Sequence, residues 1–195
     1  MKGIKDRVML GILAGLAGNT VKTLVDEVSL RYKVSQRPFR MTASGIWVTS
    51  RKEASQLRGQ ILGSIFDFGL SSLGGVGLVY LLTRTGRDHY LPKSFIFGLS
   101  FGSMVNAMLS GLPTNKVSPK DAASNLSYMV AHAFYGLTAG AVAVHLGHPS
   151  LYDTKPLSDY MEPTVPTTEQ SRRLRRRRRP PRPAPETVPV QPARH

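Results

Sequence analysis

Residues 59–82 read GQILGSIFDFGLSSLGGVGLVYLL, an apolar stretch in which Asp67 is the only charged side chain. About 20 mostly apolar residues in helical conformation cross the hydrocarbon core of a bilayer, which is about 30 Å thick. A surface helix of a soluble protein would instead present charged groups at every turn. The stretch therefore predicts a membrane-spanning helix.

Two later stretches, 94–112 and 126–146, have the same character, and burial in a soluble core cannot account for three such helices in series. A fourth stretch, 8–25, is interrupted by Asn19 and Lys22, although the long Lys side chain can reach the interface. The N-terminus has the charges of a signal peptide but lacks a small-residue cleavage site, so we interpret it as a retained first span. These spans predict an all-α integral membrane four-helix bundle over residues 1–147.

The composition changes near residue 147, and residues 148–195 hold most of the prolines and few large apolar side chains. Such a segment cannot offset the entropy lost on ordering, so we expect a disordered Arg/Pro-rich tail. Its basic run could bind phosphate groups of anionic lipid, could bind nucleic acid, or could remain a solvated charge run. The arginines of this run are Arg172, Arg173, Arg175, Arg176, Arg177, Arg178, Arg179 and Arg182.

The connection 26–58, called loop 1 below, is the longest and carries seven Lys or Arg residues. It is expected either to lie along the membrane surface or to form a solvated basic loop. Within it, Ser50 and Glu53 predict a capping box for the second long helix. Pro119 and Asp121 match the first and third positions of the fourth long helix. Both helices are thus predicted to begin before the membrane.

Trp47 and Tyr90 suit the interface between lipid and water. Basic residues near the spans number seven on the side of the termini and nine on the side of loop 1, so the positive-inside rule does not decide the orientation. Moving the arginine run across a bilayer would be costly. We therefore expect both termini in the cytoplasm.

Every predicted span carries two glycines separated by three residues. Such pairs let helix backbones approach closely in lipid, where association depends on van der Waals packing and hydrogen bonds between helices. Their presence in all four spans predicts a tightly packed bundle. The pairs are Gly11 and Gly15, Gly59 and Gly63, Gly98 and Gly102, and Gly136 and Gly140.

Polar residues lie on the same faces as these glycines, one or two helical turns away. Counted from the loop 1 side, Lys22 lies about 6 Å inside its predicted span, Asn106 about 9 Å, and Asp67 and His132 about 12 Å. An isolated charge at membrane depth costs about 3 kcal/mol. We therefore expect Lys22 and Asp67 to pair, with Asn106 and His132 completing their hydrogen bonds. The cluster is then either internal polar glue or a proton or ion pathway.

The chain contains no Cys, which excludes disulfides, thiolate nucleophiles and Cys-based metal sites. His145 and His148 have near-helical spacing, but Gly147 and Pro149 end the helix there, so we interpret them as interfacial histidines. No HExxH motif occurs, and the predicted spans hold a single carboxylate, Asp67, rather than a pair. The sequence thus predicts no metal site, no cofactor and no enzymatic activity.

Five short features, 11–15 (GILAG), 21–22 (VK), 26–27 (DE), 121–125 (DAASN) and His132, resemble small uncharacterised multi-pass membrane proteins of bacteria. The resemblance covers the membrane part and not the arginine tail. It implies a bacterial cytoplasmic membrane and transfers no activity or site.

These observations favour a non-enzymatic membrane anchor or scaffold whose tail contacts anionic lipid or another polyanion. The alternative is a small proton or cation channel or transporter subunit. Four spans seldom enclose a conduit, so this alternative would require a homo-oligomer assembled through the glycine faces.

Overall fold

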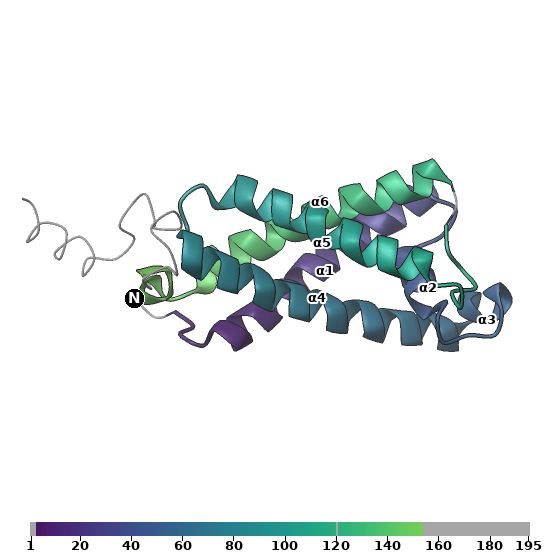
Figure 1. The fold of residues 1–195 in the computed structure, drawn as a ribbon, viewed down its shortest axis with the longest axis horizontal. Coiled ribbons are helices and arrows are strands. Elements are labelled where there is room, and N and C mark those ends of the chain that lie inside the picture. The colour runs from purple at the N-terminus through teal and green to yellow at the C-terminus, as the bar shows by residue number, and fades with distance from the viewer. Residues whose placement is uncertain (1–2, 120, 154–195) are drawn as a thin grey trace, which may run out of the picture.

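The computed structural model describes residues 3–119 and 121–153, and their regular elements are helices apart from one isolated bridge (Figure 1). Four long helices confirm the all-α class. The elements are α1 (Arg7–Arg31), α2 (Phe39–Ser44), α3 (Arg51–Ser55), α4 (Leu57–Thr85), α5 (Tyr90–Gly111), α6 (Ala122–Leu146) and the 3-10 helix η1 (Pro149–Asp153). The predicted disordered tail and its arginine contacts lie almost entirely outside the described residues.

Local hydrogen bonds and one glycine set several helix ends. The side chain of Asp6 caps α1 by accepting a hydrogen bond from the Met9 amide at 2.6 Å. Gly86 follows the last residue of α4 with a φ of 81°, a backbone conformation that favours glycine. The short turn after it lets α5 run back antiparallel to α4 (Figure 1).

Two predicted helix starts were wrong. Asp121 caps α6 by accepting a hydrogen bond from the Ser124 amide at 2.8 Å, so Pro119 precedes the helix rather than opening it. This bonding with Ser124 lowers the pKa of Asp121. Ser50 caps the short helix α3, and the extended backbone of Gln56 separates α3 from α4.

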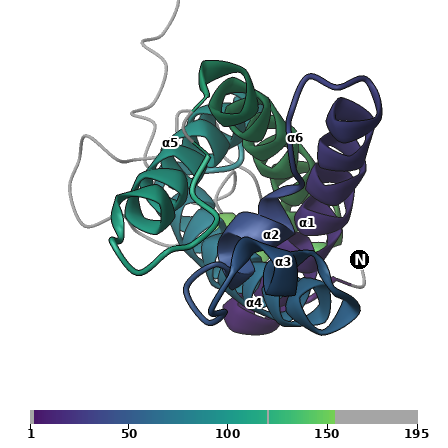
Figure 2. The same cartoon turned by 90° about the vertical axis from the view of Figure 1, so that its right-hand side faces the viewer.

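The long helices pack in the order α4, α1, α6, α5. α1 lies along both α4 and α6, and α6 lies along α5, whereas α4 and α5 contact each other over only a few residues. Figure 2, which looks along the bundle from the loop 1 end, shows α4 and α5 on separate sides with α2 between them. The N-terminal end and residue 147 meet at the opposite end, where Ile4 and Gly147 form a parallel bridge.

The core differs between the two halves of the bundle. The half near Ile4 and Gly147 is apolar, with α1, α4, α6 and η1 contributing Leu10, Ala14, Leu78, Val79, Leu82, Tyr135, Ala139, Ala143, Leu151 and Tyr152. The half near loop 1 has a smaller apolar cluster of Phe39, Ala43, Val105, Leu109 and Tyr128. Buried charged groups lie beside this second cluster.

Large apolar side chains cover the outside of the long helices. Leu24, Ile65, Leu73, Met104 and Leu126 are exposed by 61% to 68%. Polar side chains of the same helices are buried instead: Asn19, Lys22, Asp26, Asp67, Ser71, Ser94, Asn106, Ser127 and His132. All four long helices are long and apolar enough to cross a membrane.

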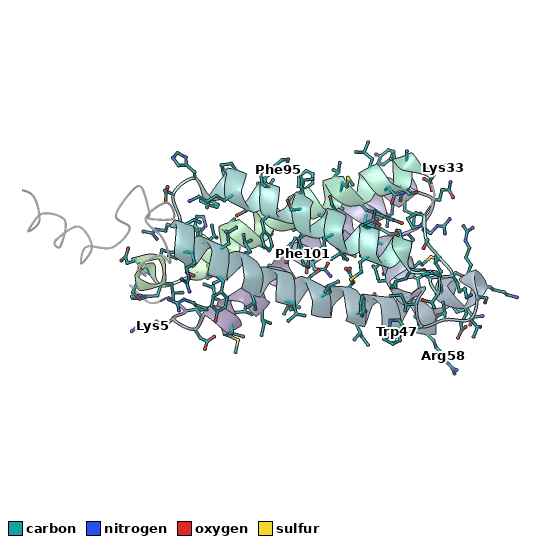
Figure 3. All side chains as sticks on the ribbon, viewed as in Figure 1. Lys5, Lys33, Trp47, Arg58, Phe95 and Phe101 are labelled. Carbon is teal, nitrogen blue, oxygen red and sulfur yellow. The ribbon has the colours of Figure 1, made fainter. Side chains whose placement is uncertain are left out.

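Charged side chains gather at the two ends of this apolar surface. Figure 3 places Lys33 and Arg58 at one end and Lys5 at the other, with Phe95 on the outside between them. Trp47 lies near the loop 1 end with 59% of its surface exposed, and its ring packs against Phe66 at 6.2 Å between centroids. The surface is therefore an apolar belt with polar ends.

The central part of loop 1 neither lies flat along a surface nor is solvated. Its helix α2 is buried in the end of the bundle, and the Arg40 carbonyl lies against Gly63 of α4 (Figure 2). Both expectations for this loop were wrong in its central part. Its apolar residues pack inside because Phe39 and Ala43 fill the space that α4 and α5 leave between them.

Candidate functional site

Two glycine seams hold the long helices close together. In the first, a Cβ atom on Gly15 of α1 would lie 2.2 Å from the Ser71 carbonyl oxygen of α4. In the second, a Cβ on Gly136 of α6 would lie 2.1 Å from the Ser94 carbonyl oxygen of α5. Neither position has room for a methyl group. The seams thus fix which faces of the helices turn inward.

The predicted glycines divide into two groups. Gly11 and Gly15 contact α4, and the seam between α5 and α6 uses Gly98, Gly102, Gly136 and Gly140. Gly59 and Gly63 contact α3 and α2 instead of another long helix. The α4 side of the first seam is formed by Gly75, whose added Cβ would lie 2.2 Å from the Gly11 carbonyl oxygen.

Lys22 of α1 and Asp67 of α4 form a buried ion pair, with the Lys22 ammonium donating to Asp67 Oδ1. The two side chains are 1% and 7% exposed. α1 continues to Arg31, well past the predicted end of its span. At 1.5 Å per residue, Lys22 therefore lies about 14 Å from the end of its helix and Asp67 about 15 Å from the start of α4. Lys22 and Asp67 therefore lie at the same height along the bundle axis, which allows their side chains to form an ion pair.

Asn106 and His132 do not complete the hydrogen bonds of this pair as predicted. The Asn106 amide donates to Asn125 Oδ1 at 2.8 Å, within the seam between α5 and α6. His132 Nδ1 lies 2.7 Å from the carbonyl oxygen of Tyr128. A carbonyl only accepts, so Nδ1 carries the hydrogen. Both side chains thus form hydrogen bonds with residues of α6 and not with Lys22 or Asp67.

Phe39 of α2 connects His132 to the ion pair. The Lys22 ammonium lies 4.5 Å from the centroid of the Phe39 ring, a cation–π contact. The rings of His132 and Tyr128 pack edge-to-face with this ring, with centroids 5.1 and 5.2 Å away. Phe39 therefore covers the charged pair from the loop 1 side.

Asp26 is the principal residue of the site that the predicted cluster omitted. It lies one turn after Lys22 on the same face of α1 and is 3% exposed. Its Oδ2 atom accepts a hydrogen bond from the Phe39 amide at 2.5 Å. The spacing of four from Lys22 was the available signal. It was insufficient because Asp26 lies beyond the predicted end of the first span.

A second polar contact omitted from the cluster lies deeper in the bundle, where Ser71 of α4 donates to Asn19 Oδ1 of α1 at 2.9 Å. Asn19 is fully buried. With the Lys22–Asp67 pair, it forms a polar line along the seam between α1 and α4. We refer to Asn19, Lys22, Asp26, Asp67 and Ser71 as the seam cluster.

The segment 35–45 closes the loop 1 end above the seam cluster, and we call it the plug. Tyr128 of α6 donates to the Arg37 carbonyl at 2.8 Å. Asn115, in the connection before α6, donates to the Thr42 carbonyl at 3.0 Å, and the Lys116 amide donates to the Gly45 carbonyl at 3.0 Å. The plug is thus held by α6 and by the connection between α5 and α6.

Among residues 3–119 and 121–153, no group of three His, Asp or Glu side chains is placed to hold a metal ion. His145 and His148 make separate local contacts, His145 with the Ala141 carbonyl and His148 with the Ser150 hydroxyl. The seam cluster has a cation and two carboxylates away from bulk water. Such groups can exchange a proton or hold helices in register.

Comparisons of the chain with protein-family models, with curated proteins and with solved structures find no match.

Proposed function

We propose that this chain is a multi-pass integral membrane protein whose four long helices cross the bilayer and whose bundle anchors or organises partners at the membrane. The observation that carries the proposal is that the long helices expose large apolar side chains and bury charged ones, the reverse of a soluble protein. Leu24, Ile65 and Leu73 point outward, whereas Lys22 and Asp67 are enclosed. In water this arrangement would expose a large apolar surface, whereas in lipid it places apolar groups against the acyl chains.

The enclosed charges support the same environment. A charge facing lipid at the centre of a helix costs about 3 kcal/mol, so charged groups at this depth turn toward the bundle interior and pair. Lys22 and Asp67 do both. Their pairing joins α1 to α4, and the plug contacts join both helices to α6. We infer that the seam cluster acts as internal polar glue, and that the rigid bundle is a platform rather than a conduit.

The predicted topology places both chain ends on one side of a bacterial cytoplasmic membrane, the cytoplasmic side. An even number of spans returns the chain to its starting side, and Ile4 and Gly147 lie side by side. From this position the arginine tail would reach anionic headgroups, each basic residue contributing about 1 kcal/mol near the surface. The tail's proposed partner is anionic lipid or another polyanion.

Single-cysteine labelling tests the topology without interference, since the chain has no Cys. Thr49→Cys in loop 1 and Ser150→Cys in η1 would each be treated with a membrane-impermeant maleimide in intact spheroplasts. The proposal predicts labelling of Thr49→Cys and protection of Ser150→Cys until the membrane is permeabilised. Labelling of both in intact cells would contradict four spans, and the reverse pattern would contradict the orientation.

A binding assay tests the role of the tail. The full chain and a variant ending at residue 171 would be placed in neutral nanodiscs and mixed with anionic vesicles. Vesicle capture is expected only with the full chain, and it should weaken steeply as salt rises because the contact is electrostatic. Capture that is independent of the tail, or unchanged by salt, would refute the electrostatic contact.

A proton or cation pathway is the second candidate, and Asp26 is the observation that favours it, since it adds a second buried carboxylate beside Lys22 and Asp67. The apolar core around Leu78 and Tyr135 counts against a route through the whole bundle. The predicted dimerisation faces are also occupied, because Gly15 and Gly136 pack within the chain. A homo-oligomeric channel would therefore need another surface.

Liposomes separate these two candidates. Purified protein would be reconstituted, a pH gradient and a membrane potential imposed, and dissipation compared between the wild type and Asp67→Asn. If the protein is an anchor, neither the wild type nor Asp67→Asn dissipates the pH gradient faster than liposomes without protein. Dissipation by the folded wild type that the substitution abolishes would establish the pathway instead.

A further inference from the structure

The carboxylate of Asp26 has one bonded and one unbonded oxygen. Oδ2 accepts the hydrogen bond from the Phe39 amide, whereas Oδ1 is inaccessible to water and has no hydrogen-bond partner. A buried carboxylate oxygen without a donor loses its hydration and gains nothing in exchange. Oδ1 is therefore the atom of the seam cluster at which a ligand is missing.

The charges around Asp26 do not balance when every carboxylate is ionised. Asp26 and Asp67 carry two negative charges against the one positive charge of Lys22. The nearby Arg40 does not belong to this buried group, because its side chain is 23% exposed and forms an ion pair with Glu27 at 3.2 Å. The buried group of three thus has a net charge of minus one.

The aromatic and imidazole groups facing this site do not supply the missing charge as they are bonded. The Tyr128 hydroxyl donates to the Arg37 carbonyl and is therefore in its neutral form. His132 uses its Nδ1 hydrogen for the Tyr128 carbonyl, and its ring packs edge-to-face with Phe39 rather than against a carboxylate. An imidazolium at this position would form no ion pair, and the charge of the Lys22 ammonium would disfavour it.

We propose that Lys22, Asp26 and Asp67 form a proton-binding site that holds one exchangeable proton, seated on Asp26 Oδ1, in the folded protein at mildly acidic pH. The proton comes from hydronium in the aqueous phase and leaves behind water. Its binding converts the Asp26 carboxylate to a carboxylic acid, so the group of three becomes neutral. Neutralisation by a proton is the usual escape for a buried charge that lacks a partner.

The surroundings of the site indicate the side from which the proton enters. Toward the end of the bundle where Ile4 meets Gly147, the contact between Asn19 and Ser71 comes next, and beyond it lies the apolar core that includes Leu78. Toward loop 1, the plug brings buried polar groups over the site, among them Arg37 and Ser44. Exchange therefore proceeds through the plug, and Phe39 is its innermost barrier. This path ends at the seam cluster and does not cross the membrane.

Infrared spectroscopy detects such a proton directly, because a protonated carboxyl group absorbs at a frequency distinct from that of a carboxylate. Full-length protein would be reconstituted in vesicles, with flotation confirming insertion, and its spectrum recorded at mildly acidic pH in H₂O and D₂O. The expected result is a carboxylic acid band that shifts in D₂O, is absent from Asp26→Asn and remains in the control Asp121→Asn. Asp26→Glu should keep an acid band at an altered frequency, which guards against loss of folding in the Asn variant.

The path of exchange is tested by the rate at which the same band shifts after transfer to D₂O. Phe39→Leu should accelerate the shift, whereas Phe95→Leu, on the outer surface, should not. Absence of the acid band from inserted wild type, or its persistence in Asp26→Asn, would overturn the site. Equal exchange rates in both Phe variants would overturn the path through the plug. Failure of flotation would refute the membrane assignment instead.

Discussion

Removing Lys22 should destabilise the protein more than removing its partner Asp67. The reason lies in the second carboxylate. In Lys22→Met, Asp67 and Asp26 remain buried together without the ammonium that the wild type places between α1 and α4. In Asp67→Asn, the ammonium keeps Asp26 one turn away on the same helix face, and the amide oxygen of Asn can still accept its hydrogen bond.

The two cases differ in expected size. Leaving a buried charge without its partner costs about 3–5 kcal/mol, which is the expectation for Lys22→Met. Asp67→Asn replaces a charged acceptor by a neutral one and should cost about 1–3 kcal/mol. The double variant Lys22→Met/Asp67→Leu removes both charges and fills the space with apolar atoms, so it should be more stable than Lys22→Met alone.

Unfolding in mixed micelles of a mild detergent and sodium dodecyl sulfate, followed by circular dichroism, gives the free energy of unfolding of all four proteins under one condition. The expected order of stability is wild type, Asp67→Asn, then Lys22→Met, with the double variant above Lys22→Met. Equal losses in the two single variants would show that Asp26 does not share the charge of Lys22. A double variant less stable than both would refute the pairing itself.

Three further predictions concern packing and the helix ends. Gly136→Ala should destabilise the bundle by about 1–3 kcal/mol because its methyl group would meet the backbone of α5, whereas Gly69→Ala, which has open space, should be neutral or stabilising in the same assay. Asp121→Ala should melt below the wild type at pH 7. Since the pKa of Asp121 is lowered below 3.8 by bonding with its helix, its contribution is present above that value, and the difference should shrink as the pH falls through the lowered pKa. Burial raises the pKa of Tyr152 from 10.0 to about 12, so the stability that its neutral hydroxyl contributes is complete below pH 10 and is lost as the pH rises through 12. Tyr152→Phe removes the hydrogen bond to the Ala143 carbonyl and should lower the free energy of unfolding by about 0.5–1.5 kcal/mol. In a melting series at increasing pH, this variant should lack the alkaline loss of stability that the wild type shows.

Hydrophobic patterning was sufficient to predict the four long helices, because the length and composition of an apolar run depend on neighbouring residues alone. The same patterning did not predict where these helices end. α1 continues six residues past its predicted end at residue 25, to Arg31, because a helix does not stop where its apolar run stops. The depth of Lys22 was underestimated for the same reason, and Asp26 was left out of the predicted cluster.

The glycine pattern predicted close packing and not its partners. Gly15 and Gly136 lie in seams between long helices, whereas Gly63, with the same spacing in sequence, receives the Arg40 carbonyl of α2. A small residue shows that something approaches closely, but the approaching group comes from elsewhere in the chain. Likewise, the arrangement of α4 and α5, which leaves space for the plug, has no local signal.

By itself, the sequence determined that this chain is all-α with four helices long and apolar enough to cross a membrane, that each of these helices has two glycines on one face, and that charged groups interrupt the apolar stretches, since all three are properties of single helices. Only the tertiary structure decided that Lys22 meets Asp67, that Asn106 and His132 bond elsewhere, and that Phe39 covers the pair. The physical reason is that a buried charge demands a partner without specifying which. The choice depends on how far each helix extends and on what the connecting segments place beside it.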